Sequence, residues 1–150
     1  MEPVLAVITT TVVGLMVGVE VAVAFVINPI TLRLPAAASL TSRAEGGRML
    51  GRTMPFWYFG SLILTVGLAV MAWGTPTTVP ALIAAGLLTI SVIMSVLLLV
   101  PINNLLRTWT ADDHPQDWCE QLRRWDRLHY LRLAIITTAF VLTATAATVL

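Results

Sequence analysis

The sequence predicts an all-α membrane protein, a bundle of four transmembrane helices, from three observations. Of the 150 residues, 57% are hydrophobic and 11% charged, whereas a soluble domain carries about a quarter charged residues. The apolar residues gather in four long stretches. All nine basic residues are arginines, and they lie in two segments, 33–52 and 107–132.

Arginine placement predicts the orientation of the bundle. Short connections dense in arginine stay in the cytoplasm, so we expect both charged segments on that side and both termini on the other side. The absence of lysine in a chain rich in alanine and arginine fits a GC-rich coding genome. We therefore expect a multi-pass protein of the cell membrane, in a bacterial inner membrane.

Each spanning helix needs about 20 mostly apolar residues. The chain offers four such stretches within a single membrane domain, 1–150. The first begins after an acidic residue and is too long for a signal peptide, so we expect it to be retained. The predicted spans are 4–27, 56–73, 79–100 and 128–150.

The connections between these spans differ in character. Residues 74–78 are uncharged and read Gly-Thr-Pro-Thr-Thr, which predicts a tight turn and an antiparallel hairpin. Residues 28–55 form a predicted basic loop, and residues 101–127 a charged loop rich in tryptophan. Aromatic residues 56–59 suit the membrane interface at the start of the second span.

The second charged segment ends in a predicted cytoplasmic amphipathic helix that continues into the fourth span. Pro115 suits a first helical turn with Asp113 or His114 as its cap, and Glu120 is expected to pair with Arg124. A stripe at spacings of three and four would face inward: Trp118, Leu122, Trp125, His129, Arg132 and Ile136.

Small residues recur at regular spacing in the first two spans. They suit close helix packing, which in lipid depends on near approach of the backbones. Such faces serve packing within one bundle or, in a homo-oligomer, between copies of the chain. The residues are Gly14, Gly18 and Ala22 in the first span and Gly60, Gly67 and Gly74 in the second.

Glu20 is the only acidic residue inside an apolar stretch. Because a carboxyl in a bilayer is costly, it is a candidate functional residue. Its alternative role is to hold helices together, by pairing with Arg132 or by accepting a hydrogen bond from Ser91 or Ser95. His129 is a further candidate, since an imidazole gains or loses a proton near neutral pH, although it could equally be a packing residue.

Other polar residues reach the same end of the bundle. Asn28 and Asn103 end the first and third predicted spans, where an amide also serves as a helix C-cap. Arg132 could extend its guanidinium to the interface. Several aromatic residues could contact a planar ligand or anchor the protein at the interface. They are Trp118, Trp125 and the cluster from Phe56 and Trp57 to Phe59.

Several function classes lack their motifs. The sequence has no phosphate-binding glycine loop, no Cys-x-x-Cys, no His-Glu-x-x-His and no nucleophile elbow. The single cysteine, Cys119, allows neither an internal disulfide nor a cysteine-based zinc site. The net charge of +1 gives no indication of a nucleic-acid partner. The expected partners are membrane lipid and a small hydrophobic molecule.

Three short motifs resemble the anthrone oxygenase-like family of small four-helix membrane proteins. They are Asn28-Pro29, Pro101-Ile102-Asn103, and Leu122-x-x-Trp125-x-x-x-His129-x-x-Arg132. The resemblance implies an oxidoreductase that converts anthrones, lipophilic aromatic compounds of polyketide pathways, into anthraquinones. It also implies molecular oxygen as co-substrate and no organic cofactor.

That chemistry suggests roles for the candidates. A base must remove a proton from the activated methylene, and His129, oriented by Glu20 or by a backbone carbonyl, is the expected base. Arg132, Asn103 and Asn28 would stabilise the enolate oxygen. The residues expected to stack on the rings are Trp125, Trp118, Phe56 and Trp57.

Two alternatives remain open from the sequence. One is a metal-dependent membrane oxidoreductase in which Glu20, His129 and His114 hold copper or iron, although the supply of ligands is small. The other is a non-enzymatic membrane subunit that binds a lipophilic molecule, or a protein partner through residues 109–127.

Overall fold

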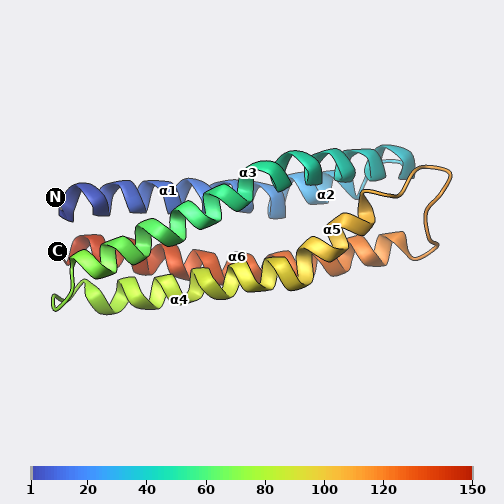
Figure 1. Ribbon diagram of the computed structural model, residues 1–150. Helices are drawn as coiled ribbons and strands as arrows, with labels where there is room; N and C mark the ends of the chain where they lie inside the picture. The colour runs from blue at the N-terminus through green and yellow to red at the C-terminus, as the bar shows by residue number, and fades with distance from the viewer. Residues whose placement is uncertain (1, 150) are drawn as a thin grey trace.

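The computed structural model describes residues 2–149 as four long helical rods packed in one bundle (Figure 1). Each rod is long and apolar enough to cross a membrane, which indicates a multi-pass membrane protein and confirms the predicted fold class. The two termini lie together at one end (Figure 1). Leu150, the predicted end of the fourth span, lies outside the described residues.

The first rod consists of three elements in series, and so does the third, whereas the second and fourth rods are single α-helices. In chain order the elements are α1 (Glu2–Ala22), η1 (Val23–Ile27), α2 (Asn28–Thr31), α3 (Ala36–Met71), α4 (Thr78–Met94), η2 (Ser95–Leu99), α5 (Val100–Leu106) and α6 (Trp118–Thr148). The elements η1 and η2 are single π-helical turns.

The predicted basic loop over 28–55 is wrong, because most of that segment is helix. Pro35 has an extended backbone, and α3 begins directly after it and continues into the membrane. The alanine, arginine and glutamate of this segment are good helix formers, and a helix can extend past the bilayer. Pro55 lies inside α3 without ending it.

The predicted caps at Asn28 and Asn103 are also wrong. Both residues lie inside helical rods, which continue to Thr31 and Leu106. The prediction placed the helix ends where the apolar residues end. Helical hydrogen bonding continues for one to two turns beyond that point, so neither amide is at a terminus.

The amphipathic extension of the fourth span is confirmed, since α6 is one helix over its whole length. The predicted cap is wrong, because α6 begins after Asp117. Thr110 and Asp113 close a turn with two mutual hydrogen bonds, which holds Asp113 outside the helix. Glu120 pairs with Arg127, at 2.7 Å, and not with the predicted Arg124.

A proline follows each π-helical turn. Pro29 comes two residues after η1, and Pro101 two residues after η2. A proline inside a helix has no N–H for the bond to the residue four positions earlier, and its ring clashes with that carbonyl. Here those carbonyls belong to Phe25 and Leu97, inside the widened turns. The prolines thus account for the two local departures from α-helical winding.

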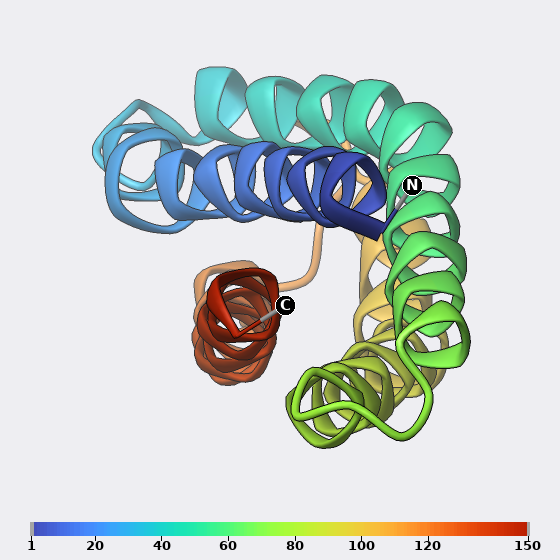
Figure 2. The same ribbon diagram turned by 90° about the vertical axis from the view of Figure 1, so that its left-hand side faces the viewer.

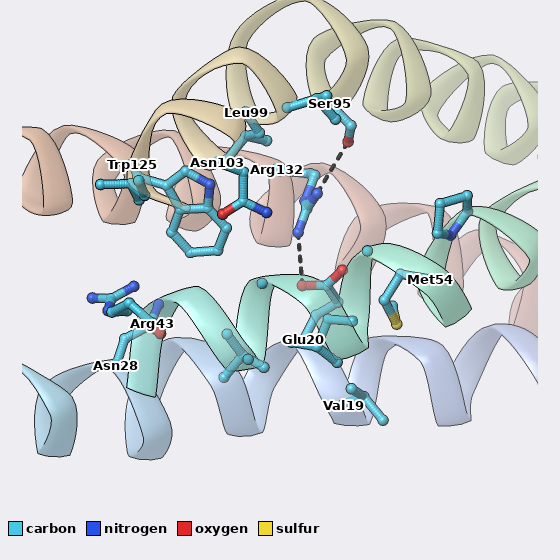
Figure 3. A pocket seen from close by; sticks show the side chains of 18 of the residues that line it. Val19, Glu20, Asn28, Arg43, Met54, Ser95, Leu99, Asn103, Trp125 and Arg132 are labelled. Atoms are coloured by element: carbon cyan, nitrogen blue, oxygen red, sulfur yellow. Dashed lines mark hydrogen bonds and ion pairs between the residues drawn. The ribbon is translucent and has the colours of Figure 1, made fainter. Parts of the chain in front are cut away.

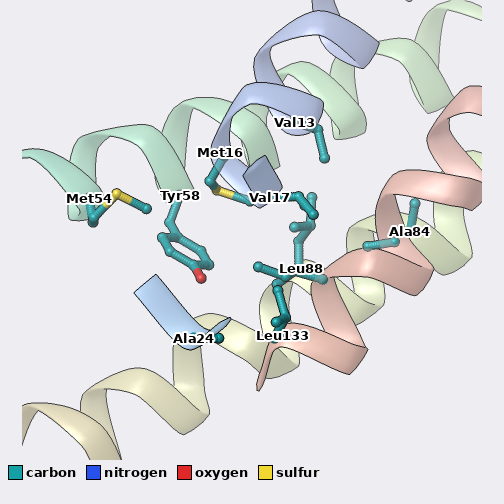
Figure 4. Close-up of a cluster of buried hydrophobic side chains, with 11 residues drawn as sticks. Val13, Met16, Val17, Ala24, Met54, Tyr58, Ala84, Leu88 and Leu133 are labelled. Carbon is teal, nitrogen blue, oxygen red and sulfur yellow. The ribbon is translucent and has the colours of Figure 1, made fainter. Parts of the chain in front are cut away.

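The rods pack around a core of aliphatic side chains. Seen from the end that carries the termini, α6 lies beside α1 and α4, and α3 passes from α1 toward α4 (Figure 2). Figure 4 shows Val13, Met16 and Leu88 meeting in the centre, where all three are fully buried. Burial of this kind fixes the angles at which the rods meet.

The glycines contribute less to packing than their spacing suggests. A Cβ atom on Gly14 would lie 2.9 Å from the ring of Phe140, so α1 and α6 approach closely there. A Cβ atom on Gly18, Gly60 or Gly67 would meet nothing within 4 Å among the described residues. Of these four positions, only Gly14 marks close contact inside the bundle.

The predicted hairpin between the second and third spans is confirmed, and its turn depends on Gly74. This residue has φ +83°, a region that costs a residue with a side chain about 1–2 kcal/mol. We therefore expect Gly74→Ala to lower the thermal unfolding midpoint in detergent, measured by circular dichroism. Gly67→Ala, in the helix, is the control and should cause no loss; an unchanged midpoint for Gly74→Ala would contradict this account.

Candidate functional site

A pocket of about 190 Å³ lies between the rods, in the half of the bundle that carries both π-helical turns (Figure 3). Its wall is mostly apolar and comes from all four rods. Two of its lining residues lie at these turns: Glu20 comes three residues before η1 begins, and Ser95 is the first residue of η2. Widened turns of this kind occur often at functional sites.

The wall of the pocket reaches the outer surface of the bundle on α3 and on η2. Two of its lining residues are also on the outer surface of the bundle, Phe59 with 52% and Val96 with 57% of its surface exposed. In a spanning helix that outer surface faces lipid. An apolar molecule could therefore enter from the membrane without crossing water.

Glu20 lies at the wall of this pocket and is only 3% exposed. Arg132 of α6 donates a hydrogen bond from Nη2 to Glu20 Oε2 at 2.8 Å, and Tyr58 of α3 donates one from its hydroxyl to Oε1, also at 2.8 Å. Arg132 also donates from Nη1 to Ser95 Oγ at 3.1 Å (Figure 3). The carboxylate of Glu20 thus joins the first, second and fourth rods, and the guanidinium of Arg132 connects them to the third rod through Ser95.

His129 is fully buried behind this ion pair and does not line the pocket. Its Nε2 lies 3.2 Å from the backbone oxygen of Glu20, and its Nδ1 lies 3.0 Å from Arg132 Nη2. Since Arg132 can only donate, Nδ1 must accept, which assigns the proton of a neutral ring to Nε2. The imidazole stacks on Trp125 at 4.9 Å between ring centres.

A second buried ion pair lies at one end of the pocket. Arg43 of α3 donates from Nη2 to both carboxylate oxygens of Asp126, at 3.0 and 2.9 Å. Asn28 donates to the same carboxylate at 2.8 Å. The guanidinium of Arg43 also lies 5.8 Å from the centre of the Trp125 ring. This cluster joins the first, second and fourth rods.

Asn103 lies at the pocket wall on α5, opposite a glycine of α3. A Cβ atom on Gly47 would lie 3.2 Å from Asn103 Oδ1, so the amide would have to shift slightly to make room for a side chain there. The absence of a side chain at Gly47 therefore lets α5 bring Asn103 against α3 at the pocket.

The structure brings together five of the nine residues that the sequence predicted for the site. These five line the pocket: Glu20, Asn28, Asn103, Trp125 and Arg132. Glu20 and Arg132 form the ion pair that the sequence offered as the alternative to a functional carboxylate. Glu20 can therefore both hold helices together and act on a molecule in the pocket, because the ion pair itself lines the pocket.

The other four predicted residues do not line it. Phe56 is 80% exposed on the outer surface of α3. Trp57 donates from Nε1 to the backbone oxygen of Val12 at 3.0 Å and so ties α3 to α1. Trp118 packs against His114 at the start of α6, and His129 lies behind the wall.

Two residues of the site were missed, and a third was given another role. Tyr58 was expected only among the aromatic residues that could contact a planar ligand, whereas it donates a hydrogen bond to Glu20. Arg43 was assigned to a loop. Asp126 was overlooked, because it lies in a charged segment and its partner Arg43 is distant in the sequence.

The three proposed metal ligands do not converge. His114 lies in the connection before α6, with Nδ1 2.9 Å from the backbone oxygen of Thr110. Among the described residues, no group of three His, Cys, Asp or Glu side chains is close enough to hold a metal ion. A three-ligand site made of Glu20, His129 and His114 is therefore not present.

Comparison with known proteins gives one result. The model of a protein family described as anthrone oxygenase matches residues 54–142, more than half of the chain. The matched region includes Tyr58, Asn103, Trp125 and Arg132, whereas Glu20 precedes it. No curated protein and no solved structure gave a match.

Proposed function

Because the chain belongs to the anthrone oxygenase family, we propose that it oxidises a lipophilic aromatic compound of the anthrone type with molecular oxygen. The observation that carries this proposal is the Glu20–Arg132 pair, a carboxylate and a guanidinium at the wall of an apolar pocket that reaches the outer surface of the bundle. In the proposed orientation the arginine-rich end of the bundle faces the cytoplasm.

The reaction converts an anthrone and one O2 into an anthraquinone and one water. Loss of a methylene proton leaves an extended aromatic enolate, which passes an electron to O2. A carbon–oxygen bond then forms, giving a hydroperoxide at the former methylene carbon. The oxygen–oxygen bond breaks as the second hydrogen of that carbon leaves as a proton, and water is released. In this proposal no organic cofactor and no metal takes part.

Glu20 is the group we assign to the first proton. It lines the pocket, and each of its carboxylate oxygens has one hydrogen-bond donor, which leaves lone pairs free to accept a proton. Arg132 is placed to stabilise the negative charge that develops on the enolate oxygen. The mostly apolar wall strengthens both interactions, because apolar side chains offer no competing hydrogen bonds.

His129, which the sequence suggested as the base, has a positioning role in this proposal. It binds the backbone oxygen of Glu20 and accepts from Arg132, so it fixes the relative placement of the two groups. Its contact with Trp125 and its burial keep it away from a molecule in the pocket.

The test of the function is oxygen consumption with anthrone as the probe. We expect the purified protein in detergent to form anthraquinone faster than the protein-free reaction, with one O2 consumed per anthraquinone and no hydrogen peroxide released. The rate should survive treatment with a metal chelator. A rate equal to that of the protein-free sample would contradict the proposed function.

Substitution of His129 by glutamine tests whether His129 is the base or only positions Glu20 and Arg132. We expect His129→Gln to lower kcat about tenfold with little change in KM, because one or two positioning hydrogen bonds are altered and no reacting group is removed. Steady-state kinetics with anthrone measures this. A loss of more than about a hundredfold, with the unfolding midpoint retained, would return the role of base to His129.

A further inference from the structure

Three nitrogen donors on residues that line the pocket have no partner among the described residues; one is the Nε of Arg132, and the other two belong to Trp125 and Arg43 at one end of the pocket. The indole Nε1 of Trp125 and the Nε of Arg43 are both buried, and neither makes a hydrogen bond with any described residue. Both residues line the pocket (Figure 3). Buried donors are nearly always satisfied in folded proteins, because leaving one unpaired is costly. Their position indicates that an acceptor atom belongs between them and the pocket interior.

The charge of this end of the pocket limits what the acceptor can be. Asp126 binds Arg43 through both carboxylate oxygens, so the cluster is neutral as a whole. Adding an anion would place a second negative charge close to Asp126 in a poorly solvated site. A neutral oxygen, such as a phenol or a carbonyl, accepts from a donor at this end of the pocket without that cost.

A ligand that reaches both Trp125 and Arg132 must extend along α6. Trp125 and Arg132 are seven residues apart, which is two helical turns and places them on one face. At the helical rise their backbones are separated by about 10 Å. Figure 3 shows Trp125 and Arg43 at one end of the pocket, and Arg132 nearer to its middle beside Glu20.

We propose that Trp125 and Arg43 form a second subsite, which binds a neutral oxygen at the far end of the aromatic substrate. The oxygen lies at the opposite end of a flat ring system from the group that meets the Glu20–Arg132 pair. This inference rests on the proposed function, since it takes the occupant to be an aromatic molecule with an oxygen at the reacting centre. It selects, among such molecules, those that carry a hydroxyl or carbonyl group on the distal ring.

Product-like probes test the subsite without turnover. The probes are 9,10-anthraquinone, its 2-hydroxy derivative and its 2-carboxylate, and the measurement is the dissociation constant of each from quenching of tryptophan fluorescence in detergent. We expect the hydroxy compound to bind the wild-type protein about fivefold more tightly than the unsubstituted compound, which corresponds to one hydrogen bond. The carboxylate should gain no affinity over the unsubstituted compound.

Trp125→Phe is the decisive variant, because it keeps an aromatic ring on His129 and removes the indole N–H, while the smaller ring affects both probes alike. We expect it to reduce the fivefold preference to about one. Trp57→Phe is the matched control, since its N–H binds the backbone of Val12 and lies outside the pocket; it should keep the preference.

The outcomes separate this inference from the proposed function. A preference that survives in Trp125→Phe, or that is missing in the wild-type protein, overturns the subsite even if anthrone is oxidised. Tightest binding of the carboxylate overturns the assignment of a neutral oxygen. The fivefold preference and its loss in Trp125→Phe would support the subsite even if oxygen consumption failed, in which case the proposed reaction alone would be rejected.

Discussion

Glu20→Gln should lower the turnover of anthrone by about 10²–10⁴-fold, the usual contribution of a general base. Glutamine has nearly the shape of glutamate, and its one carbonyl oxygen can still accept from Arg132 while its NH2 donates to the hydroxyl of Tyr58, but it cannot take up the methylene proton. The expected effect is therefore on kcat. Steady-state oxygen consumption, measured beside the unfolding midpoint of the same preparation, provides the readout.

Stability must be separated from chemistry in this experiment. Glu20→Gln leaves Arg132 as a buried charge without its counter-charge, and breaking a buried pair in this way costs about 3–5 kcal/mol. The double variant Glu20→Gln with Arg132→Gln removes both charges. We expect it to regain part of the lost unfolding midpoint and none of the activity. An active double variant would show that neither charge takes part in the reaction.

Gly46→Phe should abolish both binding of 9,10-anthraquinone and turnover of anthrone. Gly46 lines the pocket, and a Cβ atom there would meet nothing within 4 Å. A side chain can therefore leave the helix there without meeting a neighbour at its Cβ atom, and its ring would enter the pocket. The pocket, at about 190 Å³, is too small to hold that ring and a three-ring ligand together. We expect no measurable quenching of tryptophan fluorescence by the probe.

Gly60→Phe is the matched control for this change. Gly60 lies on the same helix, α3, is half-buried like Gly46, and also has open space around its Cβ position. It does not line the pocket. Both variants place the same residue in the same helix, so a shared loss of activity would point to damage to α3. Activity lost only in Gly46→Phe supports the pocket as the site of reaction.

The sequence predicted the fold well because the four spans follow from the hydropathy of consecutive residues. It predicted the helix ends poorly for the same reason. Hydropathy marks where lipid begins and ends, whereas α3 and α5 extend into polar sequence, where backbone hydrogen bonds and a few buried side chains such as Leu40 and Leu106 hold them. The π-helical turns could not be predicted from hydropathy, although Pro29 and Pro101 were visible as the residues that accompany them.

The candidate site was predicted in part for a related reason. Glu20 and Arg132 stood out because ionisable groups are rare in spans, and both line the pocket. Arg43 and Asp126 did not stand out, since each lies in a segment with several other charged residues. Their pairing joins residues 83 positions apart, which requires the packing of α3 against α6 and is not encoded in local spacing.

The two buried ion pairs have an electrical consequence. Glu20 with Arg132, and Arg43 with Asp126, each sum to zero charge. A lone carboxylate carried across the full membrane would exchange about 2.3 kcal/mol with a potential of 100 mV, but a compensated pair that stays together exchanges almost none. A transmembrane voltage therefore has no net charge on which to act at either pair.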